Sequence, residues 1–353
     1  MNLVVAKWVE NPYWQYFCGE EIFQHEVPCH PTSLPKWRQR VGVEGVEKLL
    51  KQVIRTAIEQ QALKPSALTK VNVDTTVQEK AVAFPTDARL YDKARRALVR
   101  TARQHQLRVR QSYARLGKRA LFWQSRYAVA RQGKRAQQQT RKLRTYLGRV
   151  IRDVERQATP LPQDLQALLG LAKRIHQQQR QDKGKLYSLH APETECIAKG
   201  KAHKRYEFGC KVVLATTHQS NWIVAADAVH SNPYDGATLK GALHQTQQLA
   251  GRRPQQAIVD PGFRGKSHHP EDVEVVVAGT HKRTRSRKRL LQRRSAIEPV
   301  IGHVKQDHAL KRNFLRGQQG DRMNAFLAGC GFNLRKLFRF FLTAPAKQTQ
   351  AIA

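Results

Sequence analysis

The chain has 353 residues, enough for two or three domains, and its 63 Lys plus Arg outnumber 27 Asp plus Glu for a net charge of +36. This excess favours a polyanionic partner such as nucleic acid, and widely spaced cysteines without a CxxC pair argue against a disulfide framework or a zinc ribbon. No apolar run approaches the roughly 20 residues of a membrane-spanning helix, and the first residues do not resemble a signal peptide, so we expect a cytoplasmic protein with no membrane association.

Residues 1–66 form the first predicted unit and have helical features. An apolar stripe at helical spacing starts at Val46, and Gly42 with Gly45 predicts a turn before it. Two helices around a glycine turn resemble a helix-turn-helix, but a helical pair that only packs fits the pattern equally well. The aromatic segment 12–17 is expected in the core, in preference to a platform for stacking nucleic-acid bases.

A strand is predicted next, over residues 70–77. Its alternation places Asp74 on one face and four uncharged residues on the other: Val71, Val73, Thr75 and Val77. Asp74 is therefore an acid on an otherwise apolar and neutral strand. Thr86 then predicts a helix N-cap, which makes Asp87 a first-turn acid.

The middle of the chain is strongly basic. Residues 93–152 contain nineteen Lys or Arg and no Asp or Glu, at helical apolar spacing. Such a segment would repel itself unless phosphates neutralised it, which indicates contact with DNA. A further helix is predicted around residues 165–171.

Strands return in the second half of the chain. The predicted elements are a strand at 206–216, a strand at 222–229, a helix at 238–250, a buried strand at 256–260, a strand at 273–278 and a last helix at 324–341. The strand at 256–260 ends in an acid, Asp260.

One helix is predicted to begin after Arg287. On it Arg294, Glu298, Gly302 and Lys305 would fall within about 40° of a common line. A carboxylate between two cations suits phosphodiester chemistry, and Gly302 would let a backbone approach closely.

Three acids thus become candidates for one site. In α/β sheets functional groups gather at strand ends, so Asp74 and Asp260 could meet there with Glu298 facing them. Such a trio can hold two Mg²⁺ ions about 4 Å apart. Taken singly, each acid has a structural alternative, because a strand-end Asp can cap a turn and Glu298 can pair with Arg294.

Three motifs carry a resemblance to a known family. Residues 71–90 resemble the first-aspartate segment of the DDE transposases encoded by bacterial insertion sequences, in the branch named after insertion sequence five. Residues 258–265 are similar to its second motif, Asp, one residue, Gly, aromatic. Arg294, Glu298 and Lys305 match its third motif. Two further segments look like family sequence, residues 11–17 and 190–211.

The resemblance implies an α/β fold with an RNase H-like catalytic core. That core would comprise residues 67–86 and 186–310, with a basic helical insertion at 87–185 and a C-terminal helix and tail at 311–353. Residues 1–66 would be an N-terminal helical region that recognises DNA.

The resemblance also implies a DNA transposase that cleaves insertion-sequence ends and transfers the 3′-hydroxyl ends to target DNA. Asp74, Asp260 and Glu298 would be catalytic ligands of two Mg²⁺ ions, which Mn²⁺ can replace. Further cations would contact the DNA: Arg294, Lys305, Arg264, Lys201, Lys204 and Arg205. The implied partners are double-stranded DNA, as inverted-repeat ends and target, and a second copy of the chain, at the bacterial nucleoid.

Two departures from the family pattern support an alternative. The third motif begins with a tyrosine three residues before the arginine, where this chain has Leu291. The stretch before the aromatic segment is also shorter than is common in the family. Both fit an inactive relic that binds element ends without transposing.

Overall fold

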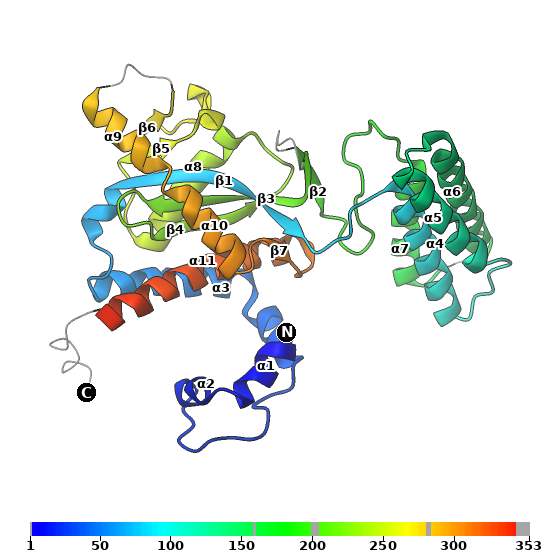
Figure 1. The fold of residues 1–353 in the computed structure, drawn as a ribbon, viewed down its shortest axis with the longest axis horizontal. Coiled ribbons are helices and arrows are strands. Elements are labelled where there is room, and N and C mark those ends of the chain that lie inside the picture. Colours follow the sequence, from blue (N-terminus) through cyan, green and yellow to red (C-terminus); the bar gives the residue numbers. More distant parts are fainter. Residues whose placement is uncertain (1, 158–159, 199–204, 280–283, 344–353) are drawn as a thin grey trace.

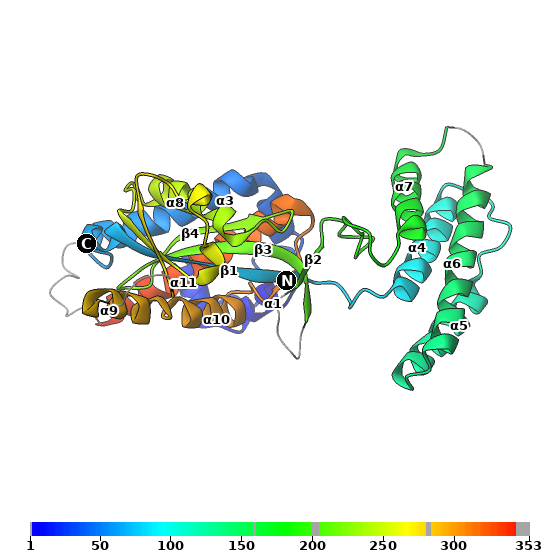
Figure 2. The same cartoon turned by 90° about the horizontal axis from the view of Figure 1, so that it is seen from above.

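The computed structural model describes residues 2–157, 160–198, 205–279 and 284–343. Its buried apolar side chains form two separate clusters, one around a seven-stranded sheet and one inside four helices. Figure 1 shows the four helices standing beside the sheet, and Figure 2 shows the two segments that connect them to it. The chain therefore combines a mixed α/β core with a helical unit, which confirms the predicted α/β class.

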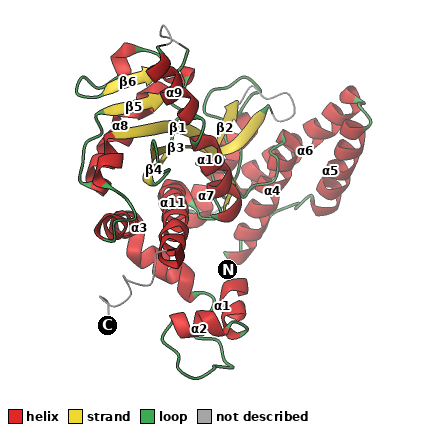
Figure 3. Ribbon diagram, turned by 60° about the vertical axis from the view of Figure 1, so that its left-hand side comes forward, coloured by secondary structure: helices red, strands yellow, loops and turns green. Residues whose placement is uncertain are grey.

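The sheet contains β1 (Lys70–Lys80), β2 (Glu195–Ala198), β3 (Tyr206–Thr217), β4 (Ile223–Val229), β5 (Gln256–Val259), β6 (Glu274–Val277) and β7 (Arg312–Asn313). β3 is antiparallel to both β1 and β4, whereas β5 runs parallel to β1 and β6 parallel to β5. Figure 3 shows β6, β5, β1, β3 and β4 side by side in that order. All five strands that were predicted from the sequence are present.

Strand β1 lies at the centre and is covered on both faces. Asn72, Thr76 and Gln78, on the same face of the strand as Asp74, are buried. Gln78 Nε2 donates to the backbone oxygen of Asp321, on a helix near the end of the chain. Elements that come last in the sequence therefore cover the face of β1 that carries Asp74.

Helices pack on both faces of the sheet. α8 (Asp235–Ala250) covers one face, and α10 (Ile297–Asp307) covers the opposite one (Figure 2). α11 (Gly317–Thr343) packs on β4 and on α3 (Ser33–Glu59).

Side chains of the packed helices close the edge of β4. The side-chain oxygen of Asn333 accepts a hydrogen bond from Ile223 N–H over 3.0 Å, and its amide nitrogen donates to the Ile223 carbonyl over 2.8 Å. Gln245 Oε1 accepts from Ala226 N–H. Pairing the free backbone groups of an edge strand in this way prevents it from pairing with another strand.

The N-terminal helices differ in how they pack. α3 is kinked at Gly42, whose φ of 64° is a left-handed value that glycine tolerates, and its second half buries the stripe from Val46 against the sheet. Before it come α1 (Asn2–Val9) and α2 (Pro12–Phe17). The expectation that this aromatic segment lies in the core was wrong, since Tyr13, Tyr16 and Phe17 are all more than four-fifths exposed.

The helical unit consists of α4 (Asp87–Gln104), α5 (Ala114–Val129), α6 (Gly133–Glu155) and α7 (Gln163–Gln177). Thr86 caps α4 as predicted, because its hydroxyl accepts from Arg89 N–H. Leu98, Leu143 and Leu147 are among the residues at the centre of its own apolar core. Across the described residues, no helix is long and apolar enough to cross a membrane.

Candidate active site

Asp74 and Asp260 lie next to each other at the end of β5. The parallel register pairs Val73 with Val259, the last residue of β5, so the next residue on each strand is one of the two acids. β5 leaves the sheet at this point, whereas β1 continues. Both acids line one cavity of about 510 Å³. The structure brings these two residues together as predicted, but only Asp260 follows the end of its strand, because β1 runs on to Lys80.

Each of these carboxylates keeps one oxygen in a local hydrogen bond. Asp74 Oδ1 accepts from the backbone N–H of Thr75 over 2.7 Å, and Asp260 Oδ1 accepts from Gly262 N–H over 2.9 Å. Asp260 is therefore also the turn cap considered as its structural alternative. In both residues the other oxygen remains for a different partner.

Burial and mutual repulsion make these acids hold their protons more firmly than usual. Burial raises the pKa of Asp74 to about 6, with the charge of Asp260 as the next cause and Arg294 opposing both. The pKa of Asp260 is also raised, by burial first and by Asp235 in addition. A cavity that disfavours two adjacent carboxylates is suited to a cation.

A third acid, Asp235, lines the same cavity and was missed by the sequence analysis. It is the first residue of α8. Its Oδ1 accepts from Lys211 Nζ over 2.8 Å and from Thr75 Oγ1 over 3.0 Å. The signal was present, because the acid stands in the turn Asn-Pro-Tyr-Asp-Gly that follows β4.

Gly262 explains the glycine of the second motif. A Cβ at this position would lie 3.0 Å from Asp235 Oδ2 and 3.0 Å from Asp260 Oδ1. Any larger residue would push one of the two carboxylates away. The glycine thus lets carboxylates from two different elements approach each other.

Glu298 lies outside this cavity, beside Asp74. Its side chain is 65% exposed, and Arg294 stands between the two acids: Nη1 is 3.6 Å from Asp74 Oδ2 and Nη2 is 3.6 Å from Glu298 Oε1. The pairing of Glu298 with Arg294 considered as its alternative is therefore present.

The prediction that one helix carries Arg294, Glu298 and Lys305 was wrong. α9 (Arg285–Arg294) ends at the arginine, and α10 starts at Ile297. Pro299 supplies the reason, because it has no N–H to donate to a carbonyl one turn earlier and is best accommodated in the first turn of a helix.

The other predicted DNA contacts are scattered. Lys305 is half-buried on α10, and beyond the surrounding turns of α10 no described atom lies within 4 Å of a Cβ placed on Gly302. Arg264 is exposed just after the turn that holds Asp260, and Arg205 lies 5.6 Å over the ring of Tyr206. Lys201 and Lys204 fall outside the described residues.

A second group of potential metal ligands lies elsewhere on the sheet. Ligand atoms of Cys210, His230 and Asp321 all come within 4.8 Å of one another. Lys80 Nζ, however, already contacts Asp321 over 2.8 Å and Glu193 over 2.6 Å. A buried ion network accounts for this group, and we assign it no metal.

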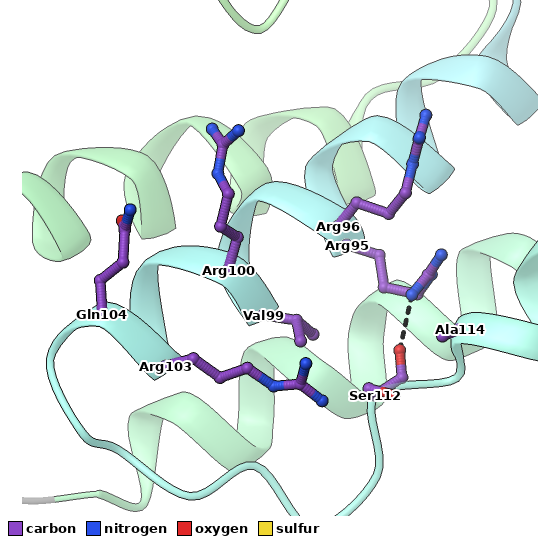
Figure 4. Close-up of a pocket in the computed structure, with 8 residues that line it drawn as sticks. All are labelled: Arg95, Arg96, Val99, Arg100, Arg103, Gln104, Ser112 and Ala114. Carbon is purple, nitrogen blue, oxygen red and sulfur yellow. Dashed lines mark hydrogen bonds between the residues drawn. The ribbon is translucent and has the colours of Figure 1, made fainter.

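Arginines of the helical unit line a separate hollow, of about 410 Å³, shown in Figure 4. Arg95 is buried and fixed by Asp92 at 2.6 Å and by the Ser112 carbonyl at 2.6 Å. Arg100 and Arg103 are exposed on the same helix. Of the described residues, four arginines and no acid line this hollow, which suits an anionic ligand such as a phosphate.

Residues 266–338 match a transposase DDE domain. The matched part includes Arg294, Glu298 and Lys305, and ends before the last turn of α11. It supports the predicted transposase on grounds independent of Asp74 and Asp260, which lie outside it.

A curated relative, the "Uncharacterized protein ORF8 in nfe locus" of Rhizobium meliloti, is 54% identical over 129 residues. These residues are 36% of this chain and 62% of the relative, so the chain spans about three-fifths of the relative's length. No solved structure matches the chain significantly.

Proposed function

We propose that this chain is a metal-dependent DNA transposase that cleaves insertion-sequence ends and transfers their 3′-hydroxyl groups to target DNA. The observation that carries the proposal is the placement of Asp74 and Asp260 side by side on parallel strands, in a cavity that disfavours their negative charges. The matched DDE domain supports the same activity. An RNase H-like core and the branch named after insertion sequence five are part of this proposal.

The donor set fits a hard divalent cation. Asp74 and Asp260 each turn one oxygen away from its local hydrogen bond, and carboxylate oxygens are what Mg²⁺ prefers. These two acids would hold the metal, with Glu298 joining from α10. When bound, Mg²⁺ or Mn²⁺ supplies charge stabilisation to the phosphate and lowers the pKa of a water or hydroxyl.

The protein's own residues position the DNA and the acids. Arg294 holds Asp74 and Glu298 toward each other and can offer guanidinium N–H groups to a phosphate oxygen. Lys211 and Thr75 fix Asp235 at the cavity wall. The half-buried surroundings of Asp74 limit water around the acids, which strengthens every charge interaction there.

The helical unit would grip the DNA backbone beside the core. Most of its basic residues face solvent around the unit's own apolar core, and the hollow lined by Arg95, Arg100 and Arg103 suits a phosphate. Phosphate contacts of this kind position a protein without reading sequence. Action on two DNA ends by a homodimer completes the proposal.

The test compares chemistry with binding in the purified chain. Asp74→Asn and Asp260→Asn should each lower Mg²⁺-dependent cleavage and joining by at least about a thousandfold, because a ligand is lost, while DNA affinity stays within about twofold. Asp227→Asn is the matched control, since Asp227 pairs with Arg322 away from the cavity. Joining at the normal rate by either cavity variant would remove that residue from the site.

One observation favours the alternative of a relic that binds DNA but does not transpose. Glu298 is largely exposed and paired with Arg294, rather than lining the cavity with the two aspartates. A relic would bind element ends with the affinity expected of its charge and show no joining above that of Asp74→Asn. The same assay therefore separates the two functions.

A further inference from the structure

The acid that joins Asp74 and Asp260 in the cavity wall is Asp235. Three carboxylates line this cavity, from β1, from the turn after β5 and from the start of α8. Glu298 does not line it. The third wall-lining acid therefore comes from a position that none of the three recognised motifs contains.

The two oxygens of Asp235 have different surroundings. Oδ1 accepts from Lys211 Nζ and Thr75 Oγ1, and Lys211 Nζ also donates to the Pro233 carbonyl over 2.6 Å. Oδ2 has no hydrogen-bond partner among the described residues. It faces the position beside Gly262 that Asp260 Oδ1 also approaches, each 3.0 Å from a Cβ placed there.

The difference between the two oxygens of Asp235 argues against a purely structural role for this residue. An acid at a helix N-terminus is favourable because of the helix dipole, but solvent exposure alone would satisfy it. Asp235 is instead held at one oxygen by two donors, and its side chain is only 30% exposed. The second oxygen lies near the carboxylate of Asp260, and two negative charges so placed are unfavourable unless a cation lies between them.

We propose that Asp235 is a further carboxylate of the metal centre, with Oδ2 binding the same divalent cation site as Asp260. This inference rests on the proposed function. Lys211 and Thr75 act as positioning residues, because they set the direction of Asp235 through its other oxygen. The glycine at position 262 is then required for two ligands to share one site.

The first experiment measures Mn²⁺ binding to the purified full-length chain by calorimetry, without DNA. In Asp235→Asn the amide oxygen can still accept from Lys211 and Thr75, but an NH₂ group replaces Oδ2. We expect Mn²⁺ affinity to fall at least tenfold in Asp235→Asn and in Asp74→Asn, and to stay unchanged in Asp227→Asn.

Its outcomes separate this inference from the function on which it rests. Loss of Mn²⁺ binding in Asp74→Asn but not in Asp235→Asn would overturn the role of Asp235 alone. Normal affinity in Asp235→Asn combined with loss in Asp235→Ala would assign it a positioning role through Oδ1, and overturn ligation. Absence of Mn²⁺ binding by the wild-type chain would overturn the proposed function and this inference with it.

A second experiment distinguishes direct ligation from a charge effect. A thiolate favours softer metals, so Asp235→Cys should make Zn²⁺ displace bound Mn²⁺ at least tenfold more effectively than in the wild type, followed by the electron paramagnetic resonance signal of Mn²⁺. The wild-type titration accounts for the five native cysteines. An unchanged ratio of Zn²⁺ to Mn²⁺ affinity would show that Asp235 does not touch the ion.

Discussion

The sheet and the helical unit use the same charged residue types in opposite ways. In the sheet, Lys211 and Arg294 each contact an acid of the cavity and so hold carboxylates in place. In the helical unit, the buried Asp92 contacts Arg95 over 2.6 Å and Arg96 over 2.9 Å and so holds guanidinium groups in place. In the cavity, cations thus orient carboxylates that suit a metal ion, whereas in the helical unit a buried acid orients guanidinium groups that suit an anion.

The largest expected effect is on the free energy of unfolding of the metal-free protein, through the carboxylates of the cavity. Because the folded-state pKa of Asp74 is about 6 and its ordinary value is 3.8, the folded state binds the proton more tightly than the unfolded state. Its contribution to stability is therefore present below about pH 3.8 and is lost as the pH rises through about 6. We expect Asp74→Asn to be more stable than wild type at pH 7 by about 3 kcal/mol, a difference that vanishes near pH 4.

Urea unfolding at several pH values in the presence of a chelator measures this difference. Asp227→Asn serves as the control and should follow the wild type. Mg²⁺ added at pH 7 should stabilise the wild type and leave Asp74→Asn nearly unchanged. If the difference in stability between Asp74→Asn and the wild type did not depend on pH, the fold would not raise the pKa of Asp74.

The next effect concerns the basic side. Replacing Arg100 and Arg103 together by Gln should weaken DNA binding about 30-fold, or about 2 kcal/mol, and reduce the salt dependence by about 0.9 per lost phosphate contact. Arg55→Gln on α3, exposed and paired with Glu59, is the matched control. Affinity and salt slope are read from fluorescence anisotropy at several salt concentrations, and an unchanged slope would place the DNA elsewhere.

The smallest effect tests whether the two regions are separate. Thr86→Ala removes the hydroxyl that caps α4 and should destabilise the helical unit by about 1 kcal/mol. Metal binding at the sheet should not change. If hydrogen exchange becomes faster in α4 to α7 while β1 stays protected, the two cores unfold separately. Equal acceleration in both regions would show that they unfold as one unit.

Local patterns predicted the parts of the fold that local interactions decide. The alternation around Asp74, the short strand ending at Asp260 and the cap at Thr86 were all readable, because each depends on neighbouring residues. The basic character of the helical unit was equally visible. These features also led to two of the acids that line the cavity.

What the sequence did not reveal depends on contacts between distant segments. The buried second face of β1 requires helices that follow it by more than two hundred residues, and Asp235 acquires its role only when α8 docks beside Thr75. The break between α9 and α10 is a different case, because Pro299 is a local sequence feature that favours a new helix start. The helical spacing of Arg294, Glu298 and Lys305 led instead to the prediction of one continuous helix.

The junction between the two regions has a consequence for how the chain folds. β1 must pair with β3 across the whole helical unit, a closure that is entropically costly for a long flexible loop. The unit's two ends lie together, with Lys185 Nζ 3.8 Å from Asp87 Oδ1 and both Phe84 and Tyr187 against the ring of Phe208. Its four helices pack mainly on one another, α4 against both α6 and α7, and small helical bundles of this kind form quickly. Once folded, the unit holds β1 and β3 close together and lowers the entropic cost of pairing them, so its early folding is expected to speed the assembly of the sheet.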